Sequence, residues 1–471
     1  MVQLDKSDAG IKCAVAGTAL HTPRCGEIEF LQDALIVIDQ PGFIQSILTP
    51  TDSHYEQLKN DLKDDDKLLE LSNNEYLLPG LIDLHIHAPQ WPQMGKALHL
   101  PLYDWLHTCT FPLEAKYADV TFAEVVYRSL VDTLLSNGTT TAVYFGTIHL
   151  DATKLLADIC VELGQRALVG RVSMDNEDQC PDYYRDLSTA KSIEDTREFI
   201  EYLRGQSSGA GIVLPAITPR FIPSCSDEAL AGHGELAEEY DCHIQTHCSE
   251  DNWSHDYGVS RFGKTDTESL LEFGLLTDKT VLAHCNFINP RDMMTIRSAQ
   301  TAIAHCPLSN FLFSNAVLPV RQLLDKGVKV GLGTDVSGGA HVSIYDSCCQ
   351  AIVASRALQE GVNANLPPED RGLADASINF KEAFWMATAG GGEALGFKVG
   401  RFSEGYCFDA MVIDAAATDS NLVIWRDMDS LEDVLQKIVY NARRPNVRTV
   451  WVQGDIVAGG IPRSNRQVPS T

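Results

Sequence analysis

The sequence predicts an α/β fold in which a (β/α)8 TIM-like barrel stands beside a small β domain built from both termini. From about Leu77, short β-branched or apolar runs alternate eight times with longer amphipathic stretches, a rhythm typical of parallel β/α units. Several of these runs end in a histidine or an aspartate, and barrel enzymes place catalytic groups at the ends of their strands. Both observations favour a closed barrel with a functional rim.

The elements of the barrel follow in order along the chain. Three of the stretches between strands, residues 122–136, 227–240 and 318–326, show apolar spacing of about 3.6 residues and are expected to form part of an outer ring of helices. The eight predicted strands are residues 76–86, 139–147, 166–174, 211–218, 241–248, 280–285, 301–306 and 328–334.

The flanks of the barrel divide the chain into three parts. Residues 79–395 are assigned to the barrel, while residues 1–78 and 396–471 are expected to build the small β domain together. The flanks contain four short strand-like runs, residues 13–18, 26–38, 409–413 and 448–457, and no helix is expected in them. The acidic stretch 61–67 is interpreted as a solvated loop, and residues 467–471 as a frayed tail.

Composition limits the classes of function. The chain has 37 basic and 64 acidic residues, a formal net charge of -27, which disfavours nucleic-acid and membrane-surface partners. No apolar run approaches the ~20 residues that span a bilayer, and the start of the chain does not resemble a signal peptide. Thirteen scattered cysteines without a Cys-x-x-Cys pair argue against a disulfide framework. We therefore expect a soluble cytoplasmic protein.

The strongest local signal is a His-x-His pair, His85 and His87, at the end of the first predicted strand. Side chains alternate along a strand, so the odd-numbered residues from Leu81 to His87 should share one face and the even-numbered residues should face the helices. Two neighbouring imidazoles suit a divalent transition metal. Taken alone, the pair is equally well explained by a structural or surface role.

Three further histidines close predicted strands: His247, His284 and His305. Each alone is best interpreted as a core histidine with a satisfied hydrogen bond. Barrel closure would bring all these strand ends to one rim. The shared position therefore favours a metal site.

Two carboxylates complete the candidate site. Asp335 ends the eighth strand, where aspartate commonly makes a turn; beside imidazoles it is better placed as an oxygen ligand and as a proton acceptor for a metal-bound water, whose pKa a metal lowers from ~15.7 toward ~7. Glu250 follows His247 by three residues and could relay protons between water and a substrate nitrogen. The alternative for Glu250 is an exposed loop glutamate.

With these motifs the chain resembles the amidohydrolase superfamily, in its deaminase branch. Within that branch it is similar to the guanine deaminases, from Gly26 to about Gly454. The first resemblance rests on Pro79-Gly-Leu-Ile-Asp-x-His-x-His87, His247-x-x-Glu250, His284, His305-Cys-Pro-x-Ser-Asn310 and Gly333-Thr-Asp335. The second rests on His87-Ala-x-Gln90, Leu100-Pro-Leu, Trp105-Leu, Thr110-Phe-Pro, Asn137-Gly-Thr-Thr-Thr141, Ile217-Thr-Pro-Arg220-Phe221 and Gly331-Leu-Gly-Thr-Asp335-Val-x-Gly-Gly339.

The resemblance implies a metal-dependent hydrolase that converts guanine and water to xanthine and ammonia with one zinc per chain, iron being the alternative metal. It also implies a cytoplasmic homodimer. His284 would hydrogen-bond the bound hydroxide and Glu250 would relay protons, with Asp335 as the third catalytic group. The implied metal ligands are His85, His87, His247 and Asp335. The implied substrate contacts are His87, Gln90, Trp91, Arg220, Phe221, His247, Glu250 and Asp335.

The residue types suit this chemistry. Guanine carries acceptors at O6 and N7 and its leaving amino group on C2, so donors should grip the edge opposite C2. Arg220 has only donors, whereas Gln90 can donate and accept. Trp91 and Phe221 could sandwich the ring. The chain departs from the family pattern at Pro89, Trp91 and Leu308 and in residues 251–265, which leaves loop shape and substrate breadth open.

Four alternatives were weighed. A sibling deaminase or chlorohydrolase could act on another heterocycle, such as a thiomethyl or S-homocysteinyl adenosine or a triazine, but Gln90 and Arg220-Phe221 favour guanine. Cytidine-type deaminases require Pro-Cys-x-x-Cys, which the sequence lacks. A non-catalytic binding protein would lose ligand positions, and here all are filled. Alternation should point Cys248, Cys285 and Cys306 toward the helices, which disfavours cysteine nucleophiles.

Overall fold

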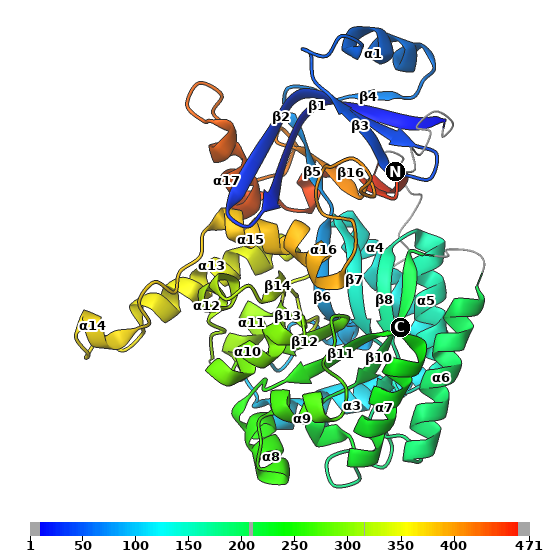
Figure 1. The fold of residues 1–471 in the computed structure, drawn as a ribbon, viewed down its shortest axis with the longest axis vertical. Coiled ribbons are helices and arrows are strands. Elements are labelled where there is room, and N and C mark those ends of the chain that lie inside the picture. Colours follow the sequence, from blue (N-terminus) through cyan, green and yellow to red (C-terminus); the bar gives the residue numbers. More distant parts are fainter. Residues whose placement is uncertain (1–9, 207–210, 315, 460–471) are drawn as a thin grey trace.

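A computed structural model describes residues 10–206, 211–314 and 316–459 and confirms the barrel. Its parallel strands are β6 (Leu81–His87), β7 (Thr139–Phe145), β8 (Arg166–Gly170), β9 (Val172–Ser173), β10 (Val213–Pro219), β11 (His243–Cys248), β12 (Thr280–His284), β13 (Ala302–His305) and β14 (Lys329–Leu332). They pair in the order β14-β13-β12-β11-β10-β8-β7-β6, with the short β9 beside β10, and contacts between β14 and β6 close the ring (Figure 1).

Helices surround this ring, as predicted. The three predicted helical stretches correspond to α4 (Val120–Ser136), α7 (Asp227–Tyr240) and α12 (Val320–Asp325). Their ends follow local capping rules. The Ser226 hydroxyl accepts the backbone N–H of Ala229 and so caps α7, and Asp119 caps α4 in the same way. The main outer helices are α4 (Val120–Ser136), α5 (Leu150–Leu163), α6 (Thr189–Gly205), α7 (Asp227–Tyr240), α10 (Pro290–Ser298), α12 (Val320–Asp325), α13 (Ile344–Glu360) and α15 (Phe380–Ala387).

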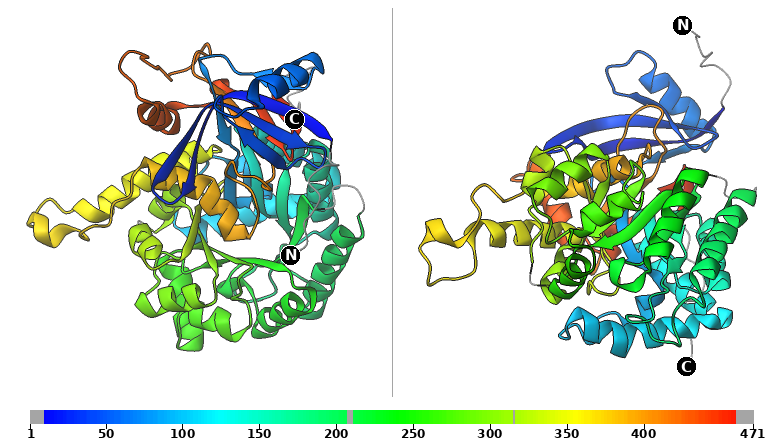
Figure 2. Two further views of the ribbon diagram at one scale, coloured as in Figure 1. Left: turned by 45° about the horizontal axis from the view of Figure 1, so that its top comes forward. Right: turned by 60° about the horizontal axis from the view of Figure 1, so that its bottom comes forward.

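Shorter segments follow the strand ends or extend the ring. The connection after β6 is the most elaborate and contains η1 (Ala88–Gln93), α2 (Leu102–Trp105), the π-helical η2 (Leu106–Thr110), α3 (Phe111–Glu114) and η3 (Ala115–Ala118). Others are η4 (Ile222–Ser224), α8 (Asn252–Phe262), α9 (Asp266–Glu272), α11 (Pro307–Phe313) and α16 (Ala389–Leu395). The segment carrying α14 (Pro368–Arg371) projects away from the body in both views of Figure 2.

A second sheet combines both flanks, which confirms the predicted composite β domain (Figures 1 and 2). A buried ion pair between Arg166 of β8 and Asp409, with Nε and Oδ2 2.8 Å apart, ties this sheet to the barrel. Its strands are β1 (Ile11–Arg24), β2 (Glu27–Asp39), β3 (Ile44–Leu48), β4 (Leu68–Glu70), β5 (Glu75–Pro79), β15 (Ala410–Asp414), β16 (Val447–Val452) and β17 (Asp455–Gly459).

The prediction that the flanks contain no helix is wrong. They carry α1 (Tyr55–Asp64), η5 (Arg444–Asn446) and α17 (Leu431–Asn441). α17 begins with a capping box between Ser430 and Asp433 and buries an apolar stripe, which gives it both a start signal and a packing face. Most of the acidic stretch 61–67 is also helical, since it forms the end of α1. Residues 467–471 lie outside the described residues.

The predicted first strand, residues 76–86, is two strands separated at Gly80. β5 joins the small sheet and β6 begins the barrel. The Gly80 N–H donates to the carbonyl of Asp409, 3.0 Å away, and a Cβ on Gly80 would lie 2.2 Å from the Thr140 hydroxyl. Only glycine fits this crossing between the two sheets. The predicted strand 448–457 is likewise a hairpin of β16 and β17.

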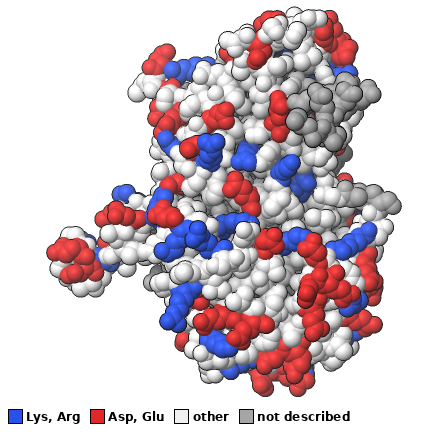
Figure 3. All heavy atoms as spheres, viewed as in Figure 1, with Lys and Arg blue, Asp and Glu red and all other residues white. Residues whose placement is uncertain are grey.

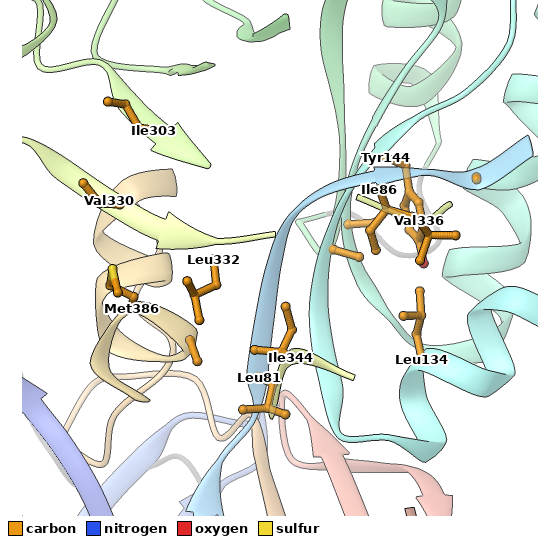
Figure 4. Close-up of a cluster of buried hydrophobic side chains, with 14 of the residues drawn as sticks. Leu81, Ile86, Leu134, Tyr144, Ile303, Val330, Leu332, Val336, Ile344 and Met386 are labelled. Carbon is orange, nitrogen blue, oxygen red and sulfur yellow. The ribbon is translucent and has the colours of Figure 1, made fainter. Parts of the chain in front are cut away.

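The predicted alternation along β6 is wrong in detail. Ile82 and Leu84 belong to a buried cluster with residues from five other barrel strands and from α16, so they point into the barrel. Leu81 and Ile86 belong instead to the cluster under the helices, and Figure 4 shows Ile86, Tyr144 and Val336 gathered near Leu134 of α4. The register of β6 against β7 shifts between Asp83 and Ile86, which reverses the alternation before the histidine pair.

The same two clusters test the expectation for the strand-end cysteines. Cys248 and Cys285 pack under the helices, as predicted, whereas Cys306 packs with the interior cluster. Cys306 therefore corrects the prediction, although it remains a buried packing residue.

The surface carries the expected excess of acidic side chains. In Figure 3 they crowd toward the lower part of the visible face, over the barrel. Within the described ranges, no helix combines the length and the apolar character needed to cross a membrane.

Candidate active site

Four buried groups meet at the ends of three barrel strands. The Nε2 atoms of His87 and His247 lie 2.9 Å apart, and the Nε2 atoms of His85 and His87 lie 3.3 and 3.7 Å from Oδ1 of Asp335. Ligand atoms of His85, His87 and His247 all lie within 4.8 Å of one another. The structure therefore brings together the four residues predicted to bind a metal.

His87 and His247 present lone pairs rather than protons. Burial, followed by the neighbouring imidazoles, lowers the pKa of His87 and of His247 well below the usual value. His247 Nδ1–H donates to the backbone carbonyl of Arg220 at 2.6 Å, which fixes the tautomer and leaves Nε2 as an acceptor. Nε2 of His85 is buried without a hydrogen-bond partner. These features fit a divalent metal ion held by imidazole and carboxylate.

Hydrogen bonds around Asp335 fix its position at the end of β14. Asp335 N–H donates to the carbonyl of His85 at 2.9 Å, and Asp83 accepts the hydroxyl of Thr334 at 2.5 Å, so β6 and the end of β14 are tied together. A Cβ on Gly338 would lie 2.6 Å from Oδ2 of Asp335. The Gly338 position therefore leaves room for the carboxylate.

Glu250 and His284 lie against the metal group, the set formed by His85, His87, His247 and Asp335, as predicted. His284 Nδ1 donates to the Asn310 side-chain oxygen at 2.9 Å, and burial lowers the pKa of His284 to about 4, so its Nε2 carries a lone pair. That Nε2 lies 3.5 Å from Oε1 of Glu250. Burial, then the charges of Asp335 and Asp251, raises the pKa of Glu250 well above its usual value. The pair can hold a proton beside the metal ligands.

His305 does not join the others. Among the described residues, the three clusters of possible metal ligands at this rim do not include it, and both its ring nitrogens are buried without hydrogen-bond partners. Its neighbour Cys306 faces the barrel interior, so His305 lies on the opposite side of the strand end.

The four residues of the metal group open into a pocket. Its walls combine ionisable groups at the strand ends with apolar side chains from the connection after β6 and from α11. The lining residues are His87, Gln90, Leu102, Trp105, Leu106, Arg220, Phe221, His247, Glu250, Phe313, Asp335 and Gly338.

One wall of the pocket is a buried polar network that includes a residue the sequence analysis missed. The Glu114 carboxylate, at the end of α3, accepts hydrogen bonds from Arg220 at 2.7 and 3.2 Å and from Gln90 Nε2 at 3.0 Å. Glu114 is completely buried. The signal that could have found it is a glutamate two residues after the Thr110-Phe-Pro motif.

The aromatic residues around the pocket differ from the prediction. Phe221 lines the pocket, as expected. In the described part of the chain, Trp91 does not line this pocket. Its indole N–H donates instead to the Ser129 hydroxyl of α4 at 3.2 Å. The tryptophan in the lining is Trp105 of α2, whose ring lies 5.1 Å from that of Phe313.

Known proteins resemble this chain over most of its length. The model of the amidohydrolase family matches residues 76–457. Guanine deaminase from Dictyostelium discoideum is 37% identical over 455 residues, which cover 93% of this chain and 96% of that protein. Human guanine deaminase is 36% identical over 446 residues, covering 93% and 95%.

A solved structure agrees in both sequence and fold. Guanine deaminase from C. acetobutylicum, crystallised with guanine in its active site, superimposes with a TM-score of 0.83 at 32% identity and covers 94% of this chain and 99% of its own. Since the family model matches residues 76–457, and sequence identity and backbone agree over more than nine-tenths of the chain, this protein belongs to the amidohydrolase family and, within it, to the guanine deaminases.

Proposed function

We propose that this protein hydrolyses guanine to xanthine and ammonia in the pocket beside the metal group. The observation that carries the proposal is the pairing of two unlike walls in one buried pocket. One wall is the imidazole and carboxylate group with Glu250, and the other offers the N–H donors of Arg220 and Gln90. A planar base with a reactive carbon on one edge and acceptors on the opposite edge fits between them.

We infer that His85, His87, His247 and Asp335 hold one zinc ion per chain. A zinc ion bound there supplies Lewis acidity that makes water a competent nucleophile near neutral pH. None of the described barrel strands ends in a lysine, whose carbamate could bridge two metal ions, which supports a single metal.

The side chains account for each proton of the reaction. As the water oxygen bonds to C2 of guanine, one water proton passes to Asp335 and Glu250 gives its proton to N3. His284 Nε2 accepts a hydrogen bond from the attacking oxygen. The remaining hydroxyl proton then returns to Glu250 and the proton on Asp335 passes to the amino nitrogen, so the C2–N bond breaks and ammonia leaves. Glu250 thus acts as acid and then as base.

The donor wall orients the base. Guanine O6 and N7 lie on the edge opposite C2 and can accept only, so they pair with the N–H groups of Arg220 and Gln90 while C2 meets the metal group. Phe221 packs on the ring face. We expect the apolar lining residues Leu102, Trp105 and Leu106 to pack against the base and to exclude a ribose on N9, so guanosine should be rejected.

The test is a substrate panel on purified protein. Guanine, guanosine, adenine, cytosine and a chlorotriazine are each followed by ammonia release and by the change in ultraviolet absorbance, and metal content is measured on the same sample. The proposal expects turnover of guanine far above the others, with about one metal per chain. Preferred turnover of a triazine or a nucleoside would assign the protein to a sibling activity, and two metals per active chain would contradict the single-zinc site.

The family resemblance also supports a cytoplasmic homodimer as part of this proposal. Sedimentation at micromolar concentration tests the oligomer, and a monomeric active protein would contradict it.

A further inference from the structure

The Glu114 carboxylate joins Arg220 and Gln90, the two donors of the wall proposed to orient the base, which is called the purine wall below. It accepts from two nitrogens of Arg220, at 2.7 and 3.2 Å, and from Nε2 of Gln90, at 3.0 Å. All three side chains are buried, with at most 2% of each residue exposed. Glu114 itself is not among the lining residues, so it acts on a ligand only through its two partners.

These contacts decide which way the Gln90 carboxamide faces. One N–H of Nε2 is directed to Glu114, and Oε1 accepts the backbone N–H of Ser337 at 3.3 Å. A carboxylate cannot donate, so the amide cannot turn over without placing its oxygen against another acceptor. The second N–H of Gln90 remains for a ligand, while Oε1 is turned toward the backbone N–H of Ser337.

The same carboxylate holds the Arg220 guanidinium in a two-point ion pair, and Arg220 also lies over the Phe111 ring at 5.1 Å. Arginine has no acceptor. Glu114 thus accepts from both groups and fixes both, and their remaining N–H groups are the donors that this wall can offer to a ligand.

We propose that Glu114 is a specificity-positioning residue, which keeps Gln90 and Arg220 as a donor-only wall and so excludes bases that carry an amino group on that edge. The proposal rests on the proposed function and deepens it, since it assigns discrimination between 6-oxo and 6-amino purines to a residue outside the pocket. A merely structural Glu114 would affect binding of both kinds of base equally.

Two ligands without the 2-amino group isolate this effect. Hypoxanthine has an acceptor at position 6 and adenine has a donor there, and neither offers a leaving group at C2. Calorimetric dissociation constants for the metal-loaded wild type should favour hypoxanthine by about 5- to 150-fold, the equivalent of the ~1–3 kcal/mol that an unsatisfied buried polar group costs. Chromatography after each titration checks that adenine is unchanged.

Glu114→Gln should lower the ratio of the adenine to the hypoxanthine dissociation constant. The carboxamide of this variant can donate as well as accept, so it no longer fixes the orientation of Gln90, whose oxygen can then turn to an amino group. Metal content should stay at the wild-type level, because Glu114 lies outside the metal group. Asp104→Asn is the matched control: Asp104 is exposed on α2 of the same connection, and loss of its charge should leave the ratio unchanged.

Glu114→Asp gives a second test if the Gln variant fails to fold. Its carboxylate is one methylene shorter and cannot reach both partners, so the ratio should lie between those of wild type and Glu114→Gln. A folded, metal-loaded Glu114 variant that keeps the wild-type ratio overturns the proposal, as does a wild type without preference for hypoxanthine. Failure of the proposed function looks different: no ammonia from guanine, with the hypoxanthine preference intact.

Discussion

The two polar walls of the pocket are built in different ways. The metal group comes from residues at the ends of barrel strands, where backbone hydrogen bonds such as Asp335 N–H to the His85 carbonyl fix its members. The purine wall is assembled from η1, α3 and the residue after β10, which only side-chain contacts bring together. The first wall depends on the barrel, and the second on Glu114.

This difference assigns catalysis to the metal group and substrate specificity to the purine wall. Changes in the metal group should abolish reaction with every base, whereas changes in the purine wall should redistribute activity among bases and leave metal content alone. Four predictions test this separation.

Loss of the metal should have the largest effect. His87→Ala removes one of four ligands, so we expect bound metal to fall well below one per chain and kcat to fall on the order of 10⁴-fold or more, because water loses its activation. Elemental analysis and ammonia release measure both. His99→Ala, at an exposed position after β6, should keep metal and activity. Full metal occupancy in His87→Ala would remove His87 from the ligand set.

Glu250→Gln should come next. The amide keeps the shape and can hydrogen-bond, but it cannot carry a proton, so kcat should fall by ~10²- to 10⁴-fold, near the upper end because Glu250 serves two transfers. Metal content should be unchanged. Asp256→Asn, an exposed carboxylate of α8, is the control for charge. Near-normal turnover of Glu250→Gln would exclude it from the mechanism.

Arg220→Lys should have a moderate and selective effect. Lysine keeps the positive charge beside Glu114 but lacks the two-pronged geometry, so kcat/KM for guanine should fall about 5- to 150-fold, the ~1–3 kcal/mol of a lost buried hydrogen bond. The ratio of guanine to adenine should fall with it. Arg220→Ala should in addition lower the melting temperature, because it leaves the buried Glu114 carboxylate without its charged partner. A lysine variant with wild-type selectivity would contradict the assignment of Arg220.

Trp91→Phe should have the smallest effect. Its indole bonds to Ser129 instead of lining the pocket, so KM for guanine should stay within about twofold of wild type and the free energy of unfolding should fall by at most about 1 kcal/mol. Trp105→Phe offers the contrast, since Trp105 lines the pocket and its loss should raise KM several-fold. A large KM change in Trp91→Phe would show that the ring reaches the substrate.

Much of the fold and one wall of the site could be predicted from the sequence. Period-two apolar runs ending in His or Asp predict strands and place their ends at one rim, which is why His85, His247 and Asp335 were found together. The errors lie where tertiary contacts override the pattern. Gly80 separates two strands because it crosses Thr140, and the register shift in β6 reverses an alternation that no propensity predicts.

The purine wall was less accessible to such reasoning. Arg220 and Gln90 were found through a family motif, but Glu114 is far from both in sequence and lies in a short helix with no periodic signal. Trp91 and Trp105 both lie in the connection after β6, and the sequence does not show which one reaches the pocket. Contact with α4 or with Phe313 decides this. Contacts between distant loops carry no local signature.

The bond from His247 to the backbone carbonyl of Arg220 has a consequence for how new substrate preferences could arise. Every amino acid has this carbonyl, so the side chain at position 220 can be exchanged while the His247 tautomer is maintained, provided that the backbone keeps its path. Evolution, or a designer, could therefore alter the base that is recognised at the very residue that steadies a metal ligand, without first having to rebuild the reacting centre.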